Sequence, residues 1–329
     1  VSQDAAGNQT TTTKTVSIDT AAPTGTTVSA VSSDNAVNAA EKAAGVIVSG
    51  AAEANSSVAI TWGGVTRTTT ADAGGNWSLA YSSAQIPTDQ SDISVLATDV
   101  AGNPSSSPTT HSVTVDTAAP SGVSIAGGST ITTNDDTPTV TVNVANDAGA
   151  EDGATVELLV NGGVVASSTL ATGATSAAIA LPTTNDGTYD LVARVTDVAG
   201  NVTTTAATDL IVDTAAPADT TITVAGEAND LNATEATATT AVTLSLASDA
   251  SFVSAAIGGT PLTEVTPGSA YTFDATGLAD GNLVITVVSQ DAAGNQTTTT
   301  KTVSIDTAVP AGTTVSAVSS DNALNAVEK

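Results

Sequence analysis

The residues best suited to chemistry in this sequence are aspartates that recur in two short motifs. The first motif, D-x-A-G-N, occurs four times and begins at Asp4, Asp99, Asp197 and Asp291. The second, V/I-D-T-A-x-P, follows each copy by 11 to 13 residues and carries Asp19, Asp116, Asp213 and Asp306. Carboxylate oxygens are preferred ligands of Ca²⁺, which takes about 6–8 oxygens. The two motifs therefore make calcium binding the first chemistry to consider.

The rest of the composition narrows the possible functions. The chain has 33 acidic and six basic residues, for a net charge of −27, which disfavours contact with nucleic-acid phosphates and with anionic membranes. His111 is the only histidine and cysteine is absent, so His/Cys zinc sites and repeated Ser–His–Asp or Cys–His sites are excluded. Composition does not exclude paired carboxylates for glycoside hydrolysis, but aromatic platforms for sugars are scarce. We expect no enzyme activity, no nucleic-acid partner and no membrane insertion.

The two motifs recur together every 93 to 98 residues, which indicates an array of one module. Residues 1–42 and 288–329 differ at only four positions, as expected for a segment of a longer array. The motifs divide the chain into the end of one module, three whole modules and the start of another, at residues 1–20, 21–117, 118–214, 215–307 and 308–329.

Within each module, short runs of alternating apolar and polar residues indicate β-strands. In residues 21–117 we predict seven strands, at 26–31, 45–51, 57–62, 66–71, 77–81, 93–99 and 110–116. Asn and Gly residues mark turns between them, and Trp62 and Trp77 fall on the apolar side. A further strand is expected at 15–18, and residues 37–44 can form at most one helical turn. The fold class predicted is all-β: tandem, Ig-like, seven-stranded antiparallel sandwiches.

The strand order places the acidic residues at the two ends of each module. In an antiparallel sandwich, loops 2–3, 4–5 and 6–7 lie beside the incoming linker, and loops 1–2, 3–4 and 5–6 lie beside the outgoing one. Each junction therefore combines residues from two neighbouring modules. The predicted Ca²⁺ ligands are Asp19, Glu53 and Asp99; Asp34, Glu41, Asp116, Glu151, Asp152 and Asp197; Asp136, Asp213, Asp249 and Asp291; and Asp306.

The aspartates of D-x-A-G-N continue the core-facing side of the strands that precede them. Asp99, for example, follows Ile93, Val95 and Ala97 at every second position. A carboxylate that faces the core is costly unless it is paired, hydrogen-bonded or bound to a metal. Six basic residues are too few to pair with all of them. Two explanations stay open and are compatible: hydrogen bonds from the backbone of the A-G-N turn, or Ca²⁺ shared by two modules and their linker.

At these motifs the chain resembles the tandem bacterial Ig-like repeats of giant, type I-secreted adhesins, the RTX-type and biofilm-associated surface proteins. Further shared runs are G-A-A-E-A-N from Gly50, D-A-G-G-N-W from Asp72 and D-N-x-x-N-x-x-E from Asp34. The resemblance implies an extracellular stalk that is stiffened by Ca²⁺ between modules. The second module lacks N-x-x-E and the third lacks D-A-G-G-N-W, so the junctions need not be alike.

The sequence therefore predicts a monomeric structural extender of a cell-surface adhesin that supports adhesion and biofilm formation and whose partners are its own neighbouring modules. An alternative is that a module binds a glycan or a host protein directly, for which the irregular residues 257–275 are the candidate. A third class, an accessory region of a secreted enzyme, has no support in these residues.

Overall fold

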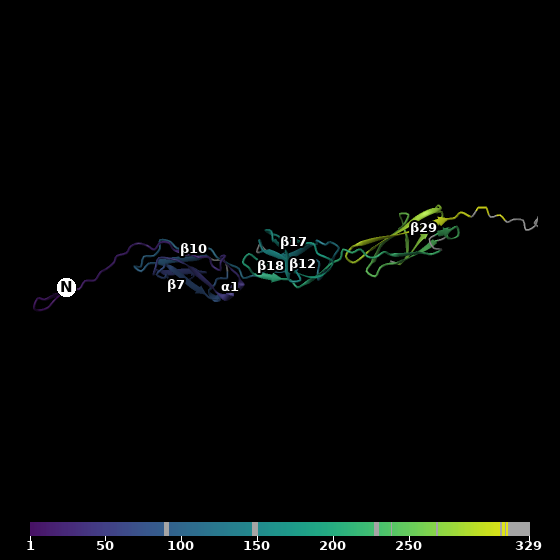
Figure 1. Cartoon of the computed structure of the whole chain (residues 1–329). Coiled ribbons are helices and arrows are strands. Elements are labelled where there is room, and N and C mark those ends of the chain that lie inside the picture. Colours follow the sequence, from purple (N-terminus) through teal and green to yellow (C-terminus); the bar gives the residue numbers. More distant parts are fainter. Residues whose placement is uncertain are drawn as a thin grey trace, which may run out of the picture. The chain divides into compact units, whose positions relative to one another are not determined.

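The computed structural model describes residues 1–88, 92–146, 151–226, 230–237, 239–267, 269–309, 311–312 and 314. The chain divides into two compact units. Unit 1 comprises Val1–Ser129, Thr139–Leu181 and Asp190–Thr208, and unit 2 comprises Thr130–Pro138, Pro182–Tyr189 and Asp209–Lys329. Figure 1 shows the elements of both units in sequence colours.

Unit 1 begins with a small hairpin and the first β-sandwich. The hairpin pairs β1 (Ser2–Gln3) with β2 (Gln9–Thr10). One sheet of the sandwich has the order β3 (Thr27–Val28), β5 (Val46–Ala51), β8 (Asn76–Tyr81). The other has the order β10 (Thr109–His111), β9 (Ile93–Thr98), β6 (Ser57–Trp62), β7 (Val65–Thr70). The 3₁₀ helix η1 (Ser83–Gln85) follows β8.

The core of the first sandwich is built from the positions that the alternation predicted. Val58, Ile60 and Trp62 of β6 are buried, as are Ile93 and Val95 of β9. Trp77 is also buried, at 3 % exposure, so the prediction that both tryptophans are core residues is confirmed. The rings of Trp62 and Tyr81 pack edge to face, with centroids 5.2 Å apart, at the end of the sandwich where β6 finishes.

Two further sheets of unit 1 belong to the second sandwich. One has the order β12 (Ser121–Ile125), β14 (Thr139–Ala145), β17 (Ser176–Ala180). In the other, β19 (Val202–Thr204) pairs with β18 (Gly187–Thr196), β18 with β15 (Thr155–Val160), and β15 with β16 (Gly163–Thr169).

Unit 2 contains β13 (Thr130–Thr133), the third sandwich and, apart from its first residue, β20 (Thr208–Val212). One sheet of that sandwich has the order β21 (Thr221–Val224), β23 (Thr239–Ser245), β27 (Ala270–Asp274), β26 (Thr263–Thr266). The other has the order β22 (Asp230–Asn232), β29 (Gln296–Asp306), β28 (Gly281–Gln290), β24 (Ser251–Ile257), β25 (Thr260–Pro261). A 3₁₀ helix, η3 (Glu235–Thr237), follows β22.

The Ig-like sandwich architecture confirms the predicted fold class, and the structure adds a short parallel strand to it. In the first sandwich, β4 (Ala36–Val37) runs parallel to β11 (Thr114–Val115). The same parallel pairing joins β13 to β20 and β22 to β29. A strand of two to four residues carries too little alternation to be predicted from the sequence.

The helix after β4 is longer than predicted. Residues 37–44 were expected to form one turn at most, but α1 spans Ala39–Ala44. Its start is fixed by a capping box, in which the Asn38 side chain accepts from the Glu41 N–H and the Glu41 carboxylate accepts from the Asn38 N–H, both at 3.0 Å. These two bonds satisfy backbone donors that a short helix otherwise leaves free.

The strand predicted at residues 15–18 is wrong, because this segment has no regular structure. The same four residues, Thr-Val-Ser-Ile, recur at 302–305 inside β29, where the neighbouring strand β28 pairs with them along its whole length. The local sequence is identical, so the difference comes from the partner strand. Strand formation here depends on tertiary pairing more than on local propensity.

Candidate functional site

Three of the four aspartates of D-x-A-G-N are buried, as their register predicted, whereas Asp4 is exposed. Asp99, Asp197 and Asp291 are each 7 % exposed. Each is held by the asparagine four residues later, which uses both its backbone N–H and its side-chain amide. Around Asp197, the Asn201 N–H donates to Oδ1 and the Asn201 Nδ2 donates to Oδ2, both at 2.8 Å. The prediction that turn hydrogen bonds satisfy the carboxylate is therefore confirmed.

The same two bonds recur in every copy of the motif, with donor–acceptor distances between 2.7 and 2.9 Å. The glycine of the motif makes this turn possible, because it has a φ between 93° and 101° in all four copies. Residues with a side chain rarely adopt that conformation. The turn is closed by a bond from the Asp N–H to the Asn carbonyl, 3.0 Å long at Asp99 and Asp197.

The asparagine also binds the linker of the second motif, and the sequence reasoning missed this role. Its Nδ2 donates to the main-chain carbonyl of the linker aspartate: Asn103 to Asp19 at 3.1 Å and Asn201 to Asp116 at 3.0 Å. In unit 2, Asn295 donates to Asp213 at 2.7 Å. The only hint in the sequence was that all four copies carry asparagine at this position.

The linker aspartates share one local conformation that presents this carbonyl. The Oδ1 of Asp116 accepts from the Ala118 N–H at 3.0 Å, and Asp19, Asp213 and Asp306 make the same bond two residues on. Such Asx turns are typical of Asp-Thr segments that leave a strand. In V/I-D-T-A-x-P, the aspartate side chain thus shapes the linker while its carbonyl receives the asparagine.

Asn201 makes one contact more than the other copies. Its Oδ1 accepts from the N–H of Ala39, the first residue of α1, at 2.9 Å. Asn201 is 6 % exposed and therefore connects its own turn, the linker at Asp116 and the start of α1 within unit 1.

The hydrogen bonds of the turn lower the pKa of Asp99 and that of Asp291. The bond from the Asn103 side chain is the main cause of the lowered pKa of Asp99, and burial opposes it. At Asp291 burial is the largest influence and acts to raise the pKa, yet the bonds from Asn295 and from nearby backbone amides together lower it. These aspartates are ionised at neutral pH and stabilise the fold until the pH falls below about 4.

Glu151 lies at the same junction as Asn201, in a very different environment. It is 8 % exposed, and its Oε2 is buried with no hydrogen-bond partner among the described residues. Burial, followed by the negative charges of Asp197 and Asp116, raises the pKa of Glu151. The backbone N–H of Glu151 donates to Asn146 Oδ1 at 2.8 Å, which fixes its place. Glu151 is thus a buried carboxylate that faces other carboxylates.

A cavity of about 530 Å³ opens beside this junction within unit 1. Three of the predicted ligands, Asp34, Asp116 and Asp152, line it together with Val198. Asp152 is held there, since its Oδ1 accepts from Asn146 Nδ2 at 2.9 Å and from the Gly173 N–H at 2.7 Å.

The other predicted ligands are less involved at the junctions. Glu41 is used in the capping box of α1. Glu53, Asp136, Asp249 and Asp306 are exposed, and Asp19 takes part at its junction through its main chain. Within the described ranges, no three His, Cys, Asp or Glu side chains gather closely enough to hold a metal as they stand. Calcium binding therefore stays a prediction.

Comparisons with known families bear on the fold. A bacterial Ig domain family matches residues 40–116, and a bacterial Ig-like domain family matches residues 123–214. The two stretches make up just over half of the chain and contain most of the first and second sandwiches. The chain belongs to the bacterial Ig-like domains. The predicted resemblance to tandem bacterial Ig-like repeats is thereby confirmed.

Solved structures similar to these bacterial Ig-like domains include several adhesins. One is a Ca²⁺-stabilised adhesin with which an Antarctic bacterium binds ice, with 31 % identity over 94 % of this chain and 80 % of that one, and a TM-score of 0.41. Another is a 1.5-MDa bacterial ice-binding adhesin, with 25 % identity over 86 % and 98 % of the two chains and a TM-score of 0.38. A third is the extending region of a large adhesion protein, with 24 % identity over 87 % and 75 % and a TM-score of 0.27.

A search of curated proteins finds no match to the chain. In the part of the chain that the structure describes, there is no helix long and apolar enough to cross a membrane.

Proposed function

We propose that this chain is an extender segment of a bacterial surface adhesin, in which tandem Ig-like modules form a stalk. The observation that carries the proposal is the repeated asparagine bridge, in which Asn103, Asn201 and Asn295 each bond the carbonyl of the preceding linker aspartate. A bond that recurs once per repeat acts on the linker, which is the place where a stalk bends. Each of these repeats thus contains a hydrogen bond that restricts the motion of its linker.

We further propose that Ca²⁺ completes the junction at Glu151. A buried carboxylate oxygen without a hydrogen bond is costly, and nearby negative charges add to that cost. The Oε2 of Glu151 is such an atom, and Asp197 and Asp116 are the charges that act on it. Hard oxygen donors of this kind fit Ca²⁺ better than they fit a softer metal.

The residues that would hold the cation are Glu151, Asp116 and Asp197, with Asp34 and Asp152 facing the adjoining cavity. Both oxygens of Asp197 already accept bonds from Asn201, so only its remaining lone pairs are free for a metal. A bound cation would supply the positive charge that this cluster lacks. Glu151 would then stabilise the junction, and Asn201 would keep Asp197 oriented.

The remaining features of the proposal follow from the stalk. Its partners are neighbouring modules of the same chain, and the chain acts as a monomer without enzymatic activity. Its place is outside the cell, at the bacterial surface. Ca²⁺ sites in extracellular modules have dissociation constants of ~10⁻⁴–10⁻³ M. A role in biofilm formation would come from the adhesin as a whole.

Small-angle scattering with and without a chelator tests the calcium-stiffened stalk. Because Ca²⁺ binds the ordered junction and not the unfolded or bent one, it shifts the equilibrium towards the ordered form. We expect chelation to reduce the maximum dimension of the chain and to lower its Tm. Replacing Ca²⁺ with Mg²⁺ is the control, and it should restore less of the extension, because Mg²⁺ demands stricter geometry.

The possible results separate the two parts of the proposal. A chain that stays extended after chelation would be an extender that does not need Ca²⁺. A chain that is compact both with and without Ca²⁺ would contradict the stalk itself.

A further inference from the structure

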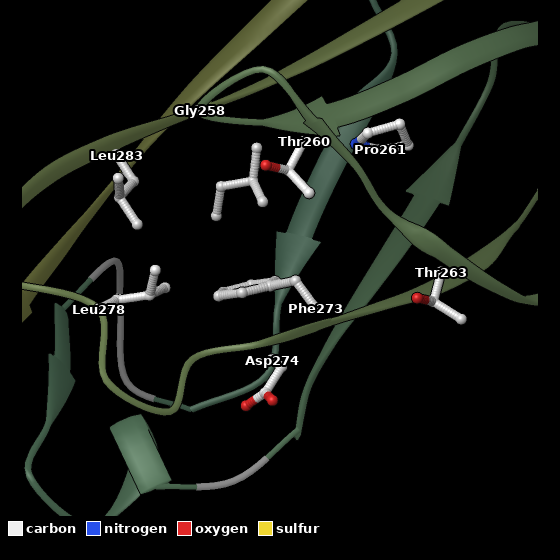
Figure 2. A pocket seen from close by; sticks show the side chains of 9 residues that line it. Gly258, Thr260, Pro261, Thr263, Phe273, Asp274, Leu278 and Leu283 are labelled. Carbon is white, nitrogen blue, oxygen red and sulfur yellow. The ribbon is translucent and has the colours of Figure 1, made fainter.

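The third sandwich contains a cavity of about 340 Å³ that has no counterpart in the function proposed above (Figure 2). Its wall is mainly apolar and includes Ile257, Phe273, Leu278 and Leu283, with Asp274 among the lining residues. In Figure 2, the Leu278 side chain lies to the left of the Phe273 ring, Leu283 lies above and to the left, and Thr260 lies above the ring. The volume is within the range of small-molecule sites, about 300–1,000 Å³.

The first sandwich has a larger side chain at the corresponding place. Trp62 ends β6 directly before Gly63-Gly64, and Ile257 ends β24 directly before Gly258-Gly259. Ile257 therefore occupies the position of Trp62.

On the other side of the cavity, Phe273 corresponds to Tyr81 of the first sandwich, because the two residues precede the D-x-A-G-N motif by the same number of residues. Tyr81 precedes Asp99 by 18 residues, and Phe273 precedes Asp291 by the same number. Tyr81 ends β8 and Phe273 lies at the end of β27, which are the corresponding strands of their sheets. The aromatic ring is thus kept at this position in both sandwiches.

In the first sandwich the Trp62 ring packs edge to face on Tyr81 and closes that end of the core. In the third sandwich the residue at the Trp62 position is isoleucine, and Ile257 and Phe273 both line the cavity. Protein interiors are otherwise closely packed, and cavities lined by apolar side chains accept apolar ligands of fitting size.

We propose that the cavity of the third sandwich binds a small aromatic molecule about the size of an indole. The ring of the ligand takes the place that Trp62 fills in the first sandwich and contacts Phe273. Phe273 is 6 % exposed, so it offers no open platform for a sugar, and the wall suits an aromatic ring better. This inference does not depend on the stalk or on calcium.

The negative charge of the protein near the cavity determines which aromatic ligands bind best. Asp274 is exposed at the cavity, and its pKa is lowered mainly by a hydrogen bond with the Thr276 side chain, so it is ionised at neutral pH. The net charge of the chain, −27, acts in the same direction. A ligand with a protonated amine is therefore favoured over a neutral one, and an anionic one is disfavoured.

Methyl-resolved NMR titration of the full chain tests the proposal with three probes: tryptamine, indole and indole-3-acetate. We expect saturable shifts at the methyls of Ile257, Leu278 and Leu283, with affinity falling in that order of probes. Nuclear Overhauser effects between the probe ring and these methyls in the unmodified chain give a readout that needs no variant. Their absence, or equal shifts in all sandwiches, would overturn the proposal.

Ile257→Trp fills the cavity with the residue found in the first sandwich, and we expect it to weaken tryptamine binding at least about tenfold. The matched control is Val265→Trp, which adds an indole at a side chain that is 64 % exposed and should leave binding unchanged. Asp274→Asn keeps an oxygen for the Thr276 N–H, and it should abolish the preference for tryptamine over indole. Undiminished binding to a folded Ile257→Trp chain would contradict the site.

Discussion

Replacing Asn201 with alanine is expected to destabilise the second sandwich by about 2–4 kcal/mol. The change removes the donor to Asp197 Oδ2 and to the Asp116 carbonyl, as well as the acceptor for the Ala39 N–H. Each buried polar group left without a partner costs about 1–3 kcal/mol. Water can reach part of this site, because Ala39 is exposed and Asp116 is partly exposed, so the three losses do not add in full.

Amide hydrogen exchange measures this loss sandwich by sandwich, which is necessary because a chain of several domains does not unfold in one step. We expect the free energy of exchange of the amides in β15 and β18 to fall by the whole of this destabilisation. That of the amides in β5 and β6, in the first sandwich, should change little.

The motif supplies its own control series for this prediction. Asn8 makes the same two bonds to Asp4, but both residues are exposed. Asn8→Ala should therefore change stability by no more than about 0.5 kcal/mol. Asn103→Ala and Asn295→Ala should lie between these limits, since both residues are partly exposed. Equal effects at Asn8 and Asn201 would mean that the bridge to linker and helix contributes nothing.

Much of the fold was predictable because alternation and turn residues act locally. The strand at Ser57–Trp62 was predicted with its observed bounds, since Val58, Ile60 and Trp62 alternate with polar residues and Gly63-Gly64 ends the run. Register also predicted that Asp99, Asp197 and Asp291 face inward, because the alternation of inward- and outward-facing side chains continues one residue beyond the strand.

The features that could not be predicted depend on distant partners. The parallel pairing of Ala36–Val37 with Thr114–Val115 joins segments almost 80 residues apart and leaves no periodic trace. Residues 15–18 read as a strand and are not one, although the same residues pair in β29.

At this junction the sequence predicted which acidic residues lie near one another, but not what connects them. Asp116 and Asp197 lie close enough to Glu151 for their charges to raise its pKa, while their binding of Ca²⁺ stays a prediction. The sequence could not show that asparagine rather than aspartate makes the connection, because both residue types are common in turns. Nor could it separate Glu151 from Glu53, although one is buried and the other is exposed.

Replacing Glu151 with glutamine is expected to have opposite effects with and without calcium. In a chelator the variant should be more stable than the unmodified chain, by about 1 kcal/mol, because an unpartnered buried carboxylate is replaced by a neutral amide. In Ca²⁺ the order should reverse, because the glutamine supplies a poorer ligand than a carboxylate. The control is Glu53→Gln, at an exposed glutamate, which should change stability little in either condition.

The pH dependence gives an independent check on the same residue. Burial first, and then Asp197 and Asp116, raise the pKa of Glu151 above its usual 4.5, so the folded chain holds this proton more tightly than the unfolded chain does. Without Ca²⁺, Glu151 therefore makes the unmodified chain lose stability as the pH rises from about 4.5 through the folded pKa, and the Glu151→Gln chain should lack that loss. The aspartates with lowered pKa make the chain lose stability as the pH falls, but only below about pH 4, which is outside this window.

Thermal melts of both chains between pH 4.5 and 7.5, in chelator and in Ca²⁺, measure all of these effects together. If the cation neutralises Glu151, the pH-dependent difference between the two chains should also disappear when Ca²⁺ is present, because the carboxylate then remains ionised without penalty. A Glu151→Gln chain that is less stable in chelator, or that keeps the full Ca²⁺ response, would show that Glu151 supports the junction through a bond of its own. The unpartnered Oε2 is the reason to expect the reverse, since an oxygen that bonds nothing stabilises only when a cation is bound to it.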